Sequence, residues 1–351
     1  MIREAIGRLI EGKNLSEQEA MGAMNCIMEG KATDAQIGSF ITALRIKGET
    51  IEEITGCARV MRKMAIRINP RVEYHIDTCG TGGDGTNSFN ISTAAAFVAA
   101  AGGVAVAKHG NRSVSSRSGS ADVLEAMGVN ISLEPGQVKE SIEEVGIGFM
   151  FAPAFHKSMK FAAGPRKELG VRTIFNILGP LTNPAEAKGQ VLGVFDAALA
   201  EPLAKVLLNL GVEKAMVVHG RDGMDEITTT DVTRVSEIKS KDIISYELSP
   251  EMFGMKRASK AELEGGDAYI NAEIINSIFK GEKGPRRDIV VLNAAASLYV
   301  GNKAASMREG VEKAEEIIDS GKALEKLNEL KEFTMRCSRP DSSSKNFLFV
   351  P

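Results

Sequence analysis

The chain has 351 residues, enough for one large domain or two ordinary ones with a substantial core. Its 43% hydrophobic and 25% charged residues are ordinary for a soluble globular protein. A net charge of −3 gives no global attraction to nucleic acid or acidic lipid, so any basic site must be local. We therefore expect neither a nucleic-acid nor a membrane partner.

The cysteines and the N-terminus favour a cytoplasmic protein. The four cysteines are scattered without a C-x-x-C pair, which is typical of reduced thiols: Cys26, Cys57, Cys79 and Cys337. Charged residues interrupt the first turns, so no signal peptide is predicted. Residues 85–107 carry no charge, but their polar side chains and the Gly102-Gly103 break predict a buried helix and a buried strand, not a membrane span.

Residues 1 to about 70 predict helices only. Capping boxes at Ser16, Thr33 and Thr50 announce three helix starts, and apolar residues recur behind them at helical spacing. Asn69-Pro70 closes this segment and makes a domain boundary near residue 72.

A glycine-rich stretch follows the apolar run at 72–76. It reads Gly80-Thr-Gly-Gly-Asp-Gly85 and leads through polar residues into an Ala-rich helix. Four glycines in six residues let the backbone approach a ligand and turn its N–H groups inward. The helix adds unpaired N–H groups and the positive end of its dipole. The stretch therefore predicts an anion cradle.

Two familiar motifs fit this stretch less well. Residues 80–85 match G-x-G-x-x-G, but a dinucleotide site requires an acidic residue about 20 positions later, at the end of the next strand. Here the predicted strand 103–107 is followed by Lys108, which suits more phosphate and makes the dinucleotide reading the second choice. The P-loop pattern is absent, because Gly85 is followed by Thr86 and Asn87.

From residue 72 apolar runs alternate with helical patterns, which implies a mainly parallel sheet covered by helices. The predicted strands are 72–76, 103–107, 147–151, 190–195 and 215–219, and the predicted helices between them include 119–127, 136–145 and 198–210. Ligands of such sheets bind beyond the carboxyl ends of the strands. Further helices are predicted at 270–280, 286–300 and 308–319.

The segment 164–187 interrupts this alternation. It is rich in Gly, Pro and Asn and carries two cations, Arg166 and Arg172. An excursion back to the first domain would explain it and would put Arg166 in or near the cleft. The predicted fold is a small all-helical domain plus a larger α/β domain with a mainly parallel central sheet, with the ligand cleft between them. The predicted domains are 1–72 with about 166–188, then 73–165 with 189–337, and a tail at 338–351.

An acidic loop follows the strand predicted at 215–219. Asp222, Asp225 and Glu226 offer oxygen ligands without His or Cys, which suits Mg²⁺. An acidic surface loop explains the same residues, and the sequence leaves both interpretations open.

Several long motifs, in the right order, resemble the anthranilate phosphoribosyltransferase family, from the N-terminal helices to beyond residue 300. They are Asp77-Thr-Cys-Gly-Thr-Gly-Gly-Asp84, Asn90-Ile-Ser-Thr93, Lys108-His-Gly-Asn-Arg112, Ser118-Gly-Ser-Ala-Asp-Val-Leu124, Arg172-Thr-Ile-Phe-Asn-Ile-Leu-Gly-Pro-Leu181 and Asp225-Glu226. The pyrimidine nucleoside phosphorylases are similar in fold but have a different glycine loop.

The resemblance implies transfer of phosphoribose from 5-phosphoribosyl diphosphate (PRPP) to the amine of anthranilate, with release of diphosphate, in tryptophan synthesis. It also implies Mg²⁺ and a homodimer built through the helical domain. The positions that match PRPP-binding residues are Gly80, Gly83, Asp84, Ser88, Asn90, Ile91, Ser92, Thr93, Lys108 and Ser120. The matching anthranilate positions are Gly80, Asn111 and Arg166, and the matching metal positions are Ser92, Asp225 and Glu226.

The residues agree with a displacement that needs charge neutralisation at the leaving group more than a strong base. The catalytic candidates are Lys108, Arg166 and His109. Lys108 would stabilise the departing group, and the guanidinium of Arg166 suits a carboxylate. His109 is either a general base or a structural histidine.

Two other functions stay open on the sequence. One is a nucleoside phosphorylase, or a transferase acting on another aromatic acceptor. The other is a non-catalytic nucleotide-binding protein of dehydrogenase-like fold, which Lys108 and the Asp225-Glu226 pair disfavour.

Overall fold

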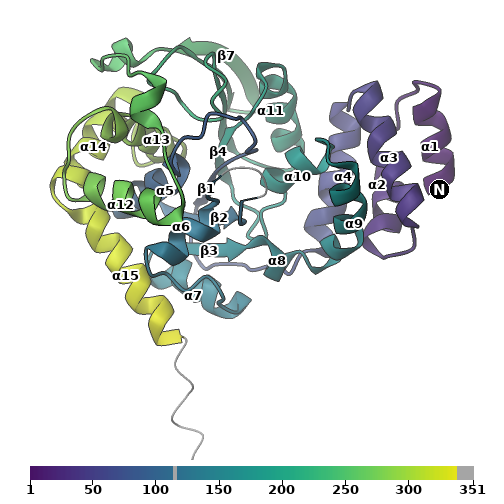
Figure 1. The fold of residues 1–351 in the computed structure, drawn as a ribbon, viewed down its shortest axis with the longest axis horizontal. Helices are drawn as coiled ribbons and strands as arrows, with labels where there is room; N and C mark the ends of the chain where they lie inside the picture. Colours follow the sequence, from purple (N-terminus) through teal and green to yellow (C-terminus); the bar gives the residue numbers. More distant parts are fainter. Residues whose placement is uncertain (114–116, 338–351) are drawn as a thin grey trace, which may run out of the picture.

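The computed structural model describes residues 1–113 and 117–337, and the predicted tail at 338–351 lies outside them. A bundle of N-terminal helices stands at one side of a larger α/β region (Figure 1). Within the described residues no helix is both long and apolar enough to cross a membrane. A helical bundle beside a larger α/β region is the architecture that the sequence predicts.

The N-terminal bundle comprises four helices, α1 (Ile2–Ile10), α2 (Glu17–Met28), α3 (Asp34–Lys47) and α4 (Ile51–Met64). The three predicted capping boxes are confirmed. The side chains of Ser16, Thr33 and Thr50 each accept a hydrogen bond from the backbone three residues on, at the starts of α2, α3 and α4. Each box satisfies backbone N–H groups that would otherwise lack a partner at the helix end.

The chain returns to this bundle after the third strand. It forms α8 (Ala152–Phe155), α9 (Lys160–Leu169) and α10 (Phe175–Leu181). α9 packs on α3, α10 packs on α4, and their buried side chains belong to the same apolar cluster as those of α2–α4. The predicted excursion at 164–187 thus begins earlier, as a helix from residue 160.

The central sheet has the strand order β3-β2-β1-β4-β5-β6-β7. The first five strands are parallel to their neighbours, whereas β6 and β7 add an antiparallel hairpin at one edge. The strands are β1 (His75–Gly80), β2 (Ala105–Gly110), β3 (Ile147–Phe151), β4 (Gly189–Gly193), β5 (Lys214–Gly220), β6 (Thr233–Lys239) and β7 (Asp242–Leu248).

The sequence misplaced the first two strands. The runs predicted at 72–76 and 103–107 end before the strands do, because polar residues at 77–80 and 108–110 continue the sheet. These residues are Asp77, Thr78, Lys108 and His109, all buried and hydrogen-bonded to each other or to Asn183. Polar side chains are not expected in a buried strand, so a search for apolar runs misses them.

The β6–β7 hairpin was also missed. Its second strand, β7, is largely exposed and mixes apolar with polar residues without regular alternation, so it lacks the usual strand pattern. Its turn places Ser240 and Lys241 at positive φ, a conformation that neither residue type announces in the sequence.

Helices cover both faces of the sheet. Besides those already described they are α5 (Ile91–Ala101), α6 (Ser120–Ala126), α7 (Pro135–Glu144), α11 (Ala200–Asn209), α12 (Ala268–Phe279), α13 (Pro285–Val300), α14 (Met307–Asp319) and α15 (Lys322–Cys337). The sequence predicted most of these, but not α15.

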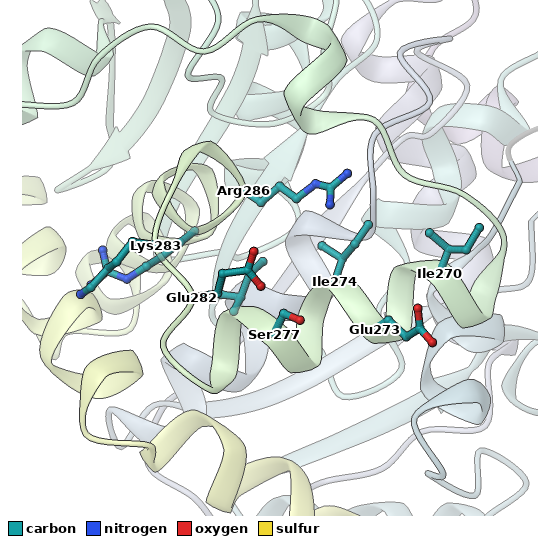
Figure 2. Close-up of a pocket in the computed structure, with 9 residues that line it drawn as sticks. Ile270, Glu273, Ile274, Ser277, Glu282, Lys283 and Arg286 are labelled. Carbon is teal, nitrogen blue, oxygen red and sulfur yellow. The ribbon is translucent and has the colours of Figure 1, made fainter.

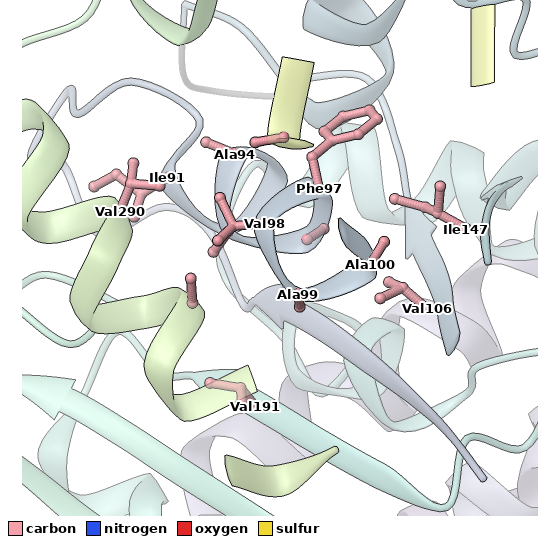
Figure 3. Packing of buried hydrophobic residues seen from close by; sticks show 14 of the residues in the cluster. Ile91, Ala94, Phe97, Val98, Ala99, Ala100, Val106, Ile147, Val191 and Val290 are labelled. Carbon is pink, nitrogen blue, oxygen red and sulfur yellow. The ribbon is translucent and has the colours of Figure 1, made fainter. Parts of the chain in front are cut away.

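Helix α5 forms the centre of the α/β core. Its alanines allow close packing on α13, while Phe97 and Val98 reach the neighbouring helices and strands (Figure 3). A Cβ at Gly102, directly after α5, would lie 2.5 Å from the Leu298 side chain, so the contact with α13 requires glycine there. The uncharged stretch 85–107 therefore contains a buried helix followed by a buried strand, as predicted.

Replacing Phe97 by Ala tests this core. Phe97 is fully buried and packs edge-on against Phe279 with ring centroids 5.9 Å apart. We expect Phe97→Ala to lower the free energy of unfolding by about 3–5 kcal/mol, because a large cavity replaces the ring. Urea denaturation measures this, with the exposed Met335→Ala as the control. Equal midpoints for the two variants would contradict the assigned core.

Candidate active site

The glycine loop after β1 and the acidic loop after β5 meet at one edge of the sheet. Their strands lie on either side of β4, with Gly80 opposite Gly193 and Gly193 opposite Val218. The backbone N–H of Gly82 donates a 2.7 Å hydrogen bond to Oδ2 of Asp225. The N–H of Asp225 in turn donates to Oδ2 of Asp84 at 3.4 Å. The two loops, about 140 residues apart in sequence, therefore form one structure.

Two glycines make this approach possible. A Cβ at Gly80 would lie 2.3 Å from Oδ2 of Asp225, and a Cβ at Gly193 would lie 1.6 Å from the Asp225 carbonyl oxygen. No side chain fits at either position. The sequence analysis assigned Gly80 to substrate binding but did not consider Gly193, because a lone glycine at a strand end carries no distinct signal.

Glu226 reaches the N-terminus of α5. Its Oε1 accepts a 3.0 Å hydrogen bond from the backbone N–H of Ser92, in the first turn of the helix. The sequence assigned this helix end to phosphate, whereas the structure gives one of its N–H groups to a carboxylate. The helix dipole favours either negative group at this position.

The side chains of Asp225 and Glu226 are partly buried and lie close to each other. Burial and then the charge of Asp225 raise the pKa of Glu226 to about 8, and Lys108 opposes this rise. Burial and then the charge of Asp84 raise the pKa of Asp225. A bound cation would stabilise the charged forms of carboxylates that repel each other in such surroundings.

This donor set fits Mg²⁺. No three His, Cys, Asp or Glu side chains of the described residues form a metal cage of their own. Mg²⁺ is usually held by one or two carboxylates together with substrate phosphates. A Mg²⁺ site therefore needs only one or two protein carboxylates when they lie beside a phosphate-binding loop. Asp225 and Glu226 could supply the carboxylates, and Ser92 lies beside Glu226.

Asn293 joins the acidic loop to helix α13. Its side chain accepts from the N–H of Ile227 at 3.0 Å and donates to the carbonyl of the same residue at 2.9 Å. Asn293 is buried in α13, so the residue after Glu226 is fixed to the core. Asp222 lies away from the cluster, because it accepts hydrogen bonds from Thr228 and Thr230 within its own loop.

Lys108 lies in strand β2 and not in a loop after it. Only 3% of it is exposed, and its Nζ donates a 2.5 Å hydrogen bond to the carbonyl of Thr78. Burial lowers its pKa, while Asp77, Cys79 and Glu226 raise it. Lys108 therefore brings positive charge close to the carboxylate of Glu226.

Asp77 and Asn183 fix the neighbourhood of Lys108. Asp77 accepts from the backbone of His109 at 3.2 Å and from the Asn183 side chain at 2.8 Å. Asn183 donates to the carbonyl of Ala107 as well, at 2.8 Å. Neither was predicted as a site residue, because a buried polar network joins distant segments and leaves no local pattern.

The glycine loop is shaped by its own polar residues. Gly82, Gly83 and Gly85 have positive φ, as has Asn87. Thr86 donates through its hydroxyl to Asp84 at 2.6 Å and to Ser88 at 3.5 Å.

Asn90 precedes α5 and joins three segments. Its amide donates to the carbonyl of Ser118 at 3.2 Å and accepts from Asn271 of α12 at 3.0 Å. Asn271 is a residue that sequence reasoning missed. Behind Asn90, Ile91 is buried in the core, and the hydroxyl of Thr93 is buried without a hydrogen-bond partner among the described residues.

Ser120 and Asn111 lie together on the β2–α6 side. The hydroxyl of Ser120, at the start of α6, donates to the Asn111 carbonyl at 3.3 Å. A Cβ at Gly110 would lie 2.2 Å from that hydroxyl oxygen, so the close contact depends on glycine.

Arg166 and Arg172 differ in their surroundings. Arg166 of α9 lies over the Phe175 ring at 5.0 Å, and burial lowers its pKa. No carboxylate of the described residues forms an ion pair with it, which leaves its charge available. The cation that touches the glycine loop is Arg172, which donates to the carbonyl of Gly83.

The histidines and Cys79 have structural surroundings. His109 and His156 lie with ring centroids 5.0 Å apart, and burial lowers the pKa of His109 to about 3 and that of His156 to about 4. A ring that stays neutral at such low pH is a weak base, so these surroundings favour the structural interpretation of His109. His219 contacts the Val194 carbonyl, and burial raises the pKa of the Cys79 thiol.

A cavity of about 340 Å³ lies elsewhere, between α12 and the start of α13 (Figure 2). Three cations line it, but Lys283 and Arg287 are paired with carboxylates of α14, and Arg286 donates to backbone carbonyls. None of the predicted site residues lines this cavity. We therefore place the candidate site at the meeting point of the two loops.

Comparisons with known proteins show which family the chain belongs to. Residues 73–324 match the model of the α/β domain of a glycosyl transferase family, and residues 3–65 match its helical bundle domain. The anthranilate phosphoribosyltransferase of Acetivibrio thermocellus is 72% identical over 334 residues, covering 95% of this chain and 97% of that relative. The chain belongs to the anthranilate phosphoribosyltransferase family.

Solved structures of this family have the same fold. The anthranilate phosphoribosyltransferase of Thermus thermophilus is 45% identical with a TM-score of 0.90, over 94% of this chain and 99% of that one. The enzyme of Saccharomyces cerevisiae, in complex with PRPP and Mg, is 28% identical with a TM-score of 0.87, over 95% and 98%. The fold class and the family resemblance predicted from the sequence are thus confirmed.

The buried carboxylates predict a pH-dependent stability in metal-free protein. The raised pKa of Glu226 means that the folded state binds this proton more tightly than the unfolded chain does. Stability is therefore lost as pH rises from about 5 through the folded pKa. We expect the midpoint of thermal unfolding to fall by roughly 2–4 °C between about pH 6 and pH 9 without divalent cations.

Glu226→Gln is the matched variant, since it keeps the shape and removes the titration. Its melting temperature should depend less on pH than that of the unaltered protein. Identical slopes in scanning calorimetry would show that Glu226 is not a buried carboxylate.

Proposed function

We propose that this protein transfers the 5-phosphoribosyl group of PRPP to the amine of anthranilate. The products are N-(5-phosphoribosyl)anthranilate, an intermediate of tryptophan synthesis, and diphosphate. The observation that carries the proposal is the direct contact between the glycine loop and the acidic loop, at the hydrogen bond from Gly82 to Asp225. It puts phosphate-binding backbone beside metal-binding carboxylates.

PRPP would lie along the loops that leave β1 and β2. The proposed binding residues lie in β1 and β2, in the glycine loop and at the starts of α5 and α6: Gly80, Gly83, Asp84, Ser88, Asn90, Ile91, Ser92, Thr93, Lys108 and Ser120. Ser92, Asp225 and Glu226 would hold Mg²⁺, which the yeast relative contains together with PRPP. When bound, the metal supplies positive charge to the diphosphate as it departs.

The bond from the ribose C1 to the diphosphate oxygen breaks, and a bond from the anthranilate nitrogen to C1 forms. The departing diphosphate takes the electrons of the broken bond, and the glycine-loop N–H groups and Lys108 stabilise its charge. The amine loses its proton after the new bond forms, and the neutral amine needs no strong base beforehand. Gly80, Asn111 and Arg166 would position anthranilate, with Arg166 opposite its carboxylate.

Oligomeric state, location and domain division complete the proposal. A homodimer through the helical domain is supported by large apolar side chains exposed on α1 and α3, Ile10 and Ile46. A cytoplasmic location is supported by four free cysteines. The packing of α9 on α3 and of α10 on α4 supports a helical domain of 1–72 and about 166–188, with 73–165 and 189–337 as the α/β domain.

Loss of anthranilate fluorescence in the presence of PRPP and Mg²⁺ tests the reaction. We expect the fluorescence to fall, and we expect the fall to require all three components and the protein. Phosphorolysis of a pyrimidine nucleoside without consumption of anthranilate would instead support the phosphorylase alternative and contradict the proposal.

Arg166→Ala tests the acceptor site. Loss of a charged hydrogen bond to a carboxylate should raise the KM for anthranilate by roughly 10- to 100-fold, with a much smaller change in the KM for PRPP. Initial rates with one substrate varied at a time give both constants. Equal increases in both would remove Arg166 from this role.

A further inference from the structure

Arg172 contacts the glycine loop from the connection between α9 and α10. Its guanidinium donates a hydrogen bond to the carbonyl oxygen of Gly83 and lies 4.3 Å above the ring centre of Phe195. A Cβ built at Gly83 would lie 3.6 Å from a guanidinium nitrogen, so the arginine packs directly on this turn of the loop.

The aromatic partner is itself bound to the same loop. The backbone N–H of Phe195 donates to the hydroxyl of Thr81 at 3.1 Å, and the N–H of Thr81 donates to the Gly193 carbonyl at 2.9 Å. Thr81 is thus bound by the backbone of Phe195, and Gly83 is bound by the guanidinium that lies over the Phe195 ring. Arg172, Phe195, Thr81 and Gly83 are therefore joined by a continuous set of contacts at the first half of the glycine loop.

The backbone of Arg172 is anchored on the helical side. It lies in the short connection between α9 and α10, and the next two residues, Thr173 and Ile174, are buried. The N–H of Thr173 donates to the Asn176 side chain at 2.9 Å. The arginine itself is exposed, and within the described residues no carboxylate forms an ion pair with it. Its contacts therefore go to the loop and not to an acidic partner.

We propose that Arg172 is a positioning residue, which ties the phosphate-binding glycine loop to the α9–α10 segment and, with Phe195, holds it ready for PRPP. This inference rests on the proposed function and extends it to a residue outside the assigned substrate contacts. A planar guanidinium can stack on a ring and donate to a carbonyl at once, which an ammonium group cannot do equally well. Fixing the loop before binding lowers the entropy lost when PRPP orders it.

Three variants separate positioning from direct binding. Arg172→Lys keeps the positive charge but loses the planar stack, Arg172→Gln removes the charge, and Phe195→Leu removes the ring while leaving Arg172 in place. We expect each to raise the KM for PRPP by about tenfold, with kcat and the KM for anthranilate changed much less. The double variant Arg172→Gln with Phe195→Leu should be little worse than either single variant, because both break one unit.

Lys167→Gln is the control, since it removes an exposed positive charge from the same segment. Its KM for PRPP should stay unchanged. Thermal unfolding identifies any variant that fails to fold, and calorimetric titration of PRPP into the protein with Mg²⁺ measures binding without turnover.

A normal KM for PRPP in folded Phe195→Leu, together with a large increase in Arg172→Gln, would show direct phosphate contact and overturn the positioning role. Unchanged KM values in all three variants would overturn it as well. Absence of turnover in the unaltered protein would contradict the proposed function itself. Normal turnover in the unaltered protein, with an unchanged KM for PRPP in the variants, would contradict only the positioning role of Arg172.

Discussion

The close approach of Asp225 to the ends of β1 and β4, by its carboxylate at Gly80 and by its backbone at Gly193, is the contact on which the site depends. It is possible only because positions 80 and 193 have no side chain. Once the acidic loop lies there, Gly82 can donate to Asp225 and Ser92 can donate to Glu226. One steric condition thus joins the glycine loop, the acidic loop and the first turn of α5.

This arrangement has an electrostatic consequence. Burial, and then the charge of a neighbouring carboxylate, raises the pKa of both Asp225 and Glu226, and the buried Lys108 offsets only part of the rise at Glu226. A protein built for stability alone would not gather like charges in this way, since burial of uncompensated charge is costly. The cluster is suited to a ligand that brings cations and phosphates together, and strain of this kind is typical of functional sites.

The sequence predicted what repeats or stands close together in the chain. The capping boxes of α2–α4, the alternation of strands and helices, and the glycine loop all rest on local spacing, and the structure has them. The resemblance to a family supplied residue roles that spacing alone cannot provide. The acidic loop was recognised from its composition and was expected at the ligand end of its strand, near the glycine loop, but the hydrogen bonds that join the two loops were not predicted.

The rest depends on tertiary contacts. Asp77 and Lys108 are polar, so the sequence predicts that each lies just beyond the end of a strand, although both are buried. Their partners Asn183 and Thr78 come close only in the folded structure. Asn271 and Asn293 act from helices about 65 to 180 residues away from the segments that they hold. A pattern read along one chain has no means of pairing such residues.

A crystal structure with PRPP and Mg²⁺ bound tests the central claim most directly. We expect the diphosphate against the N–H groups of the glycine loop and a metal ion between it and the side chains of Asp225 and Glu226. Electron density for PRPP in the cavity between α12 and α13, or a metal ion remote from both carboxylates, would contradict the account.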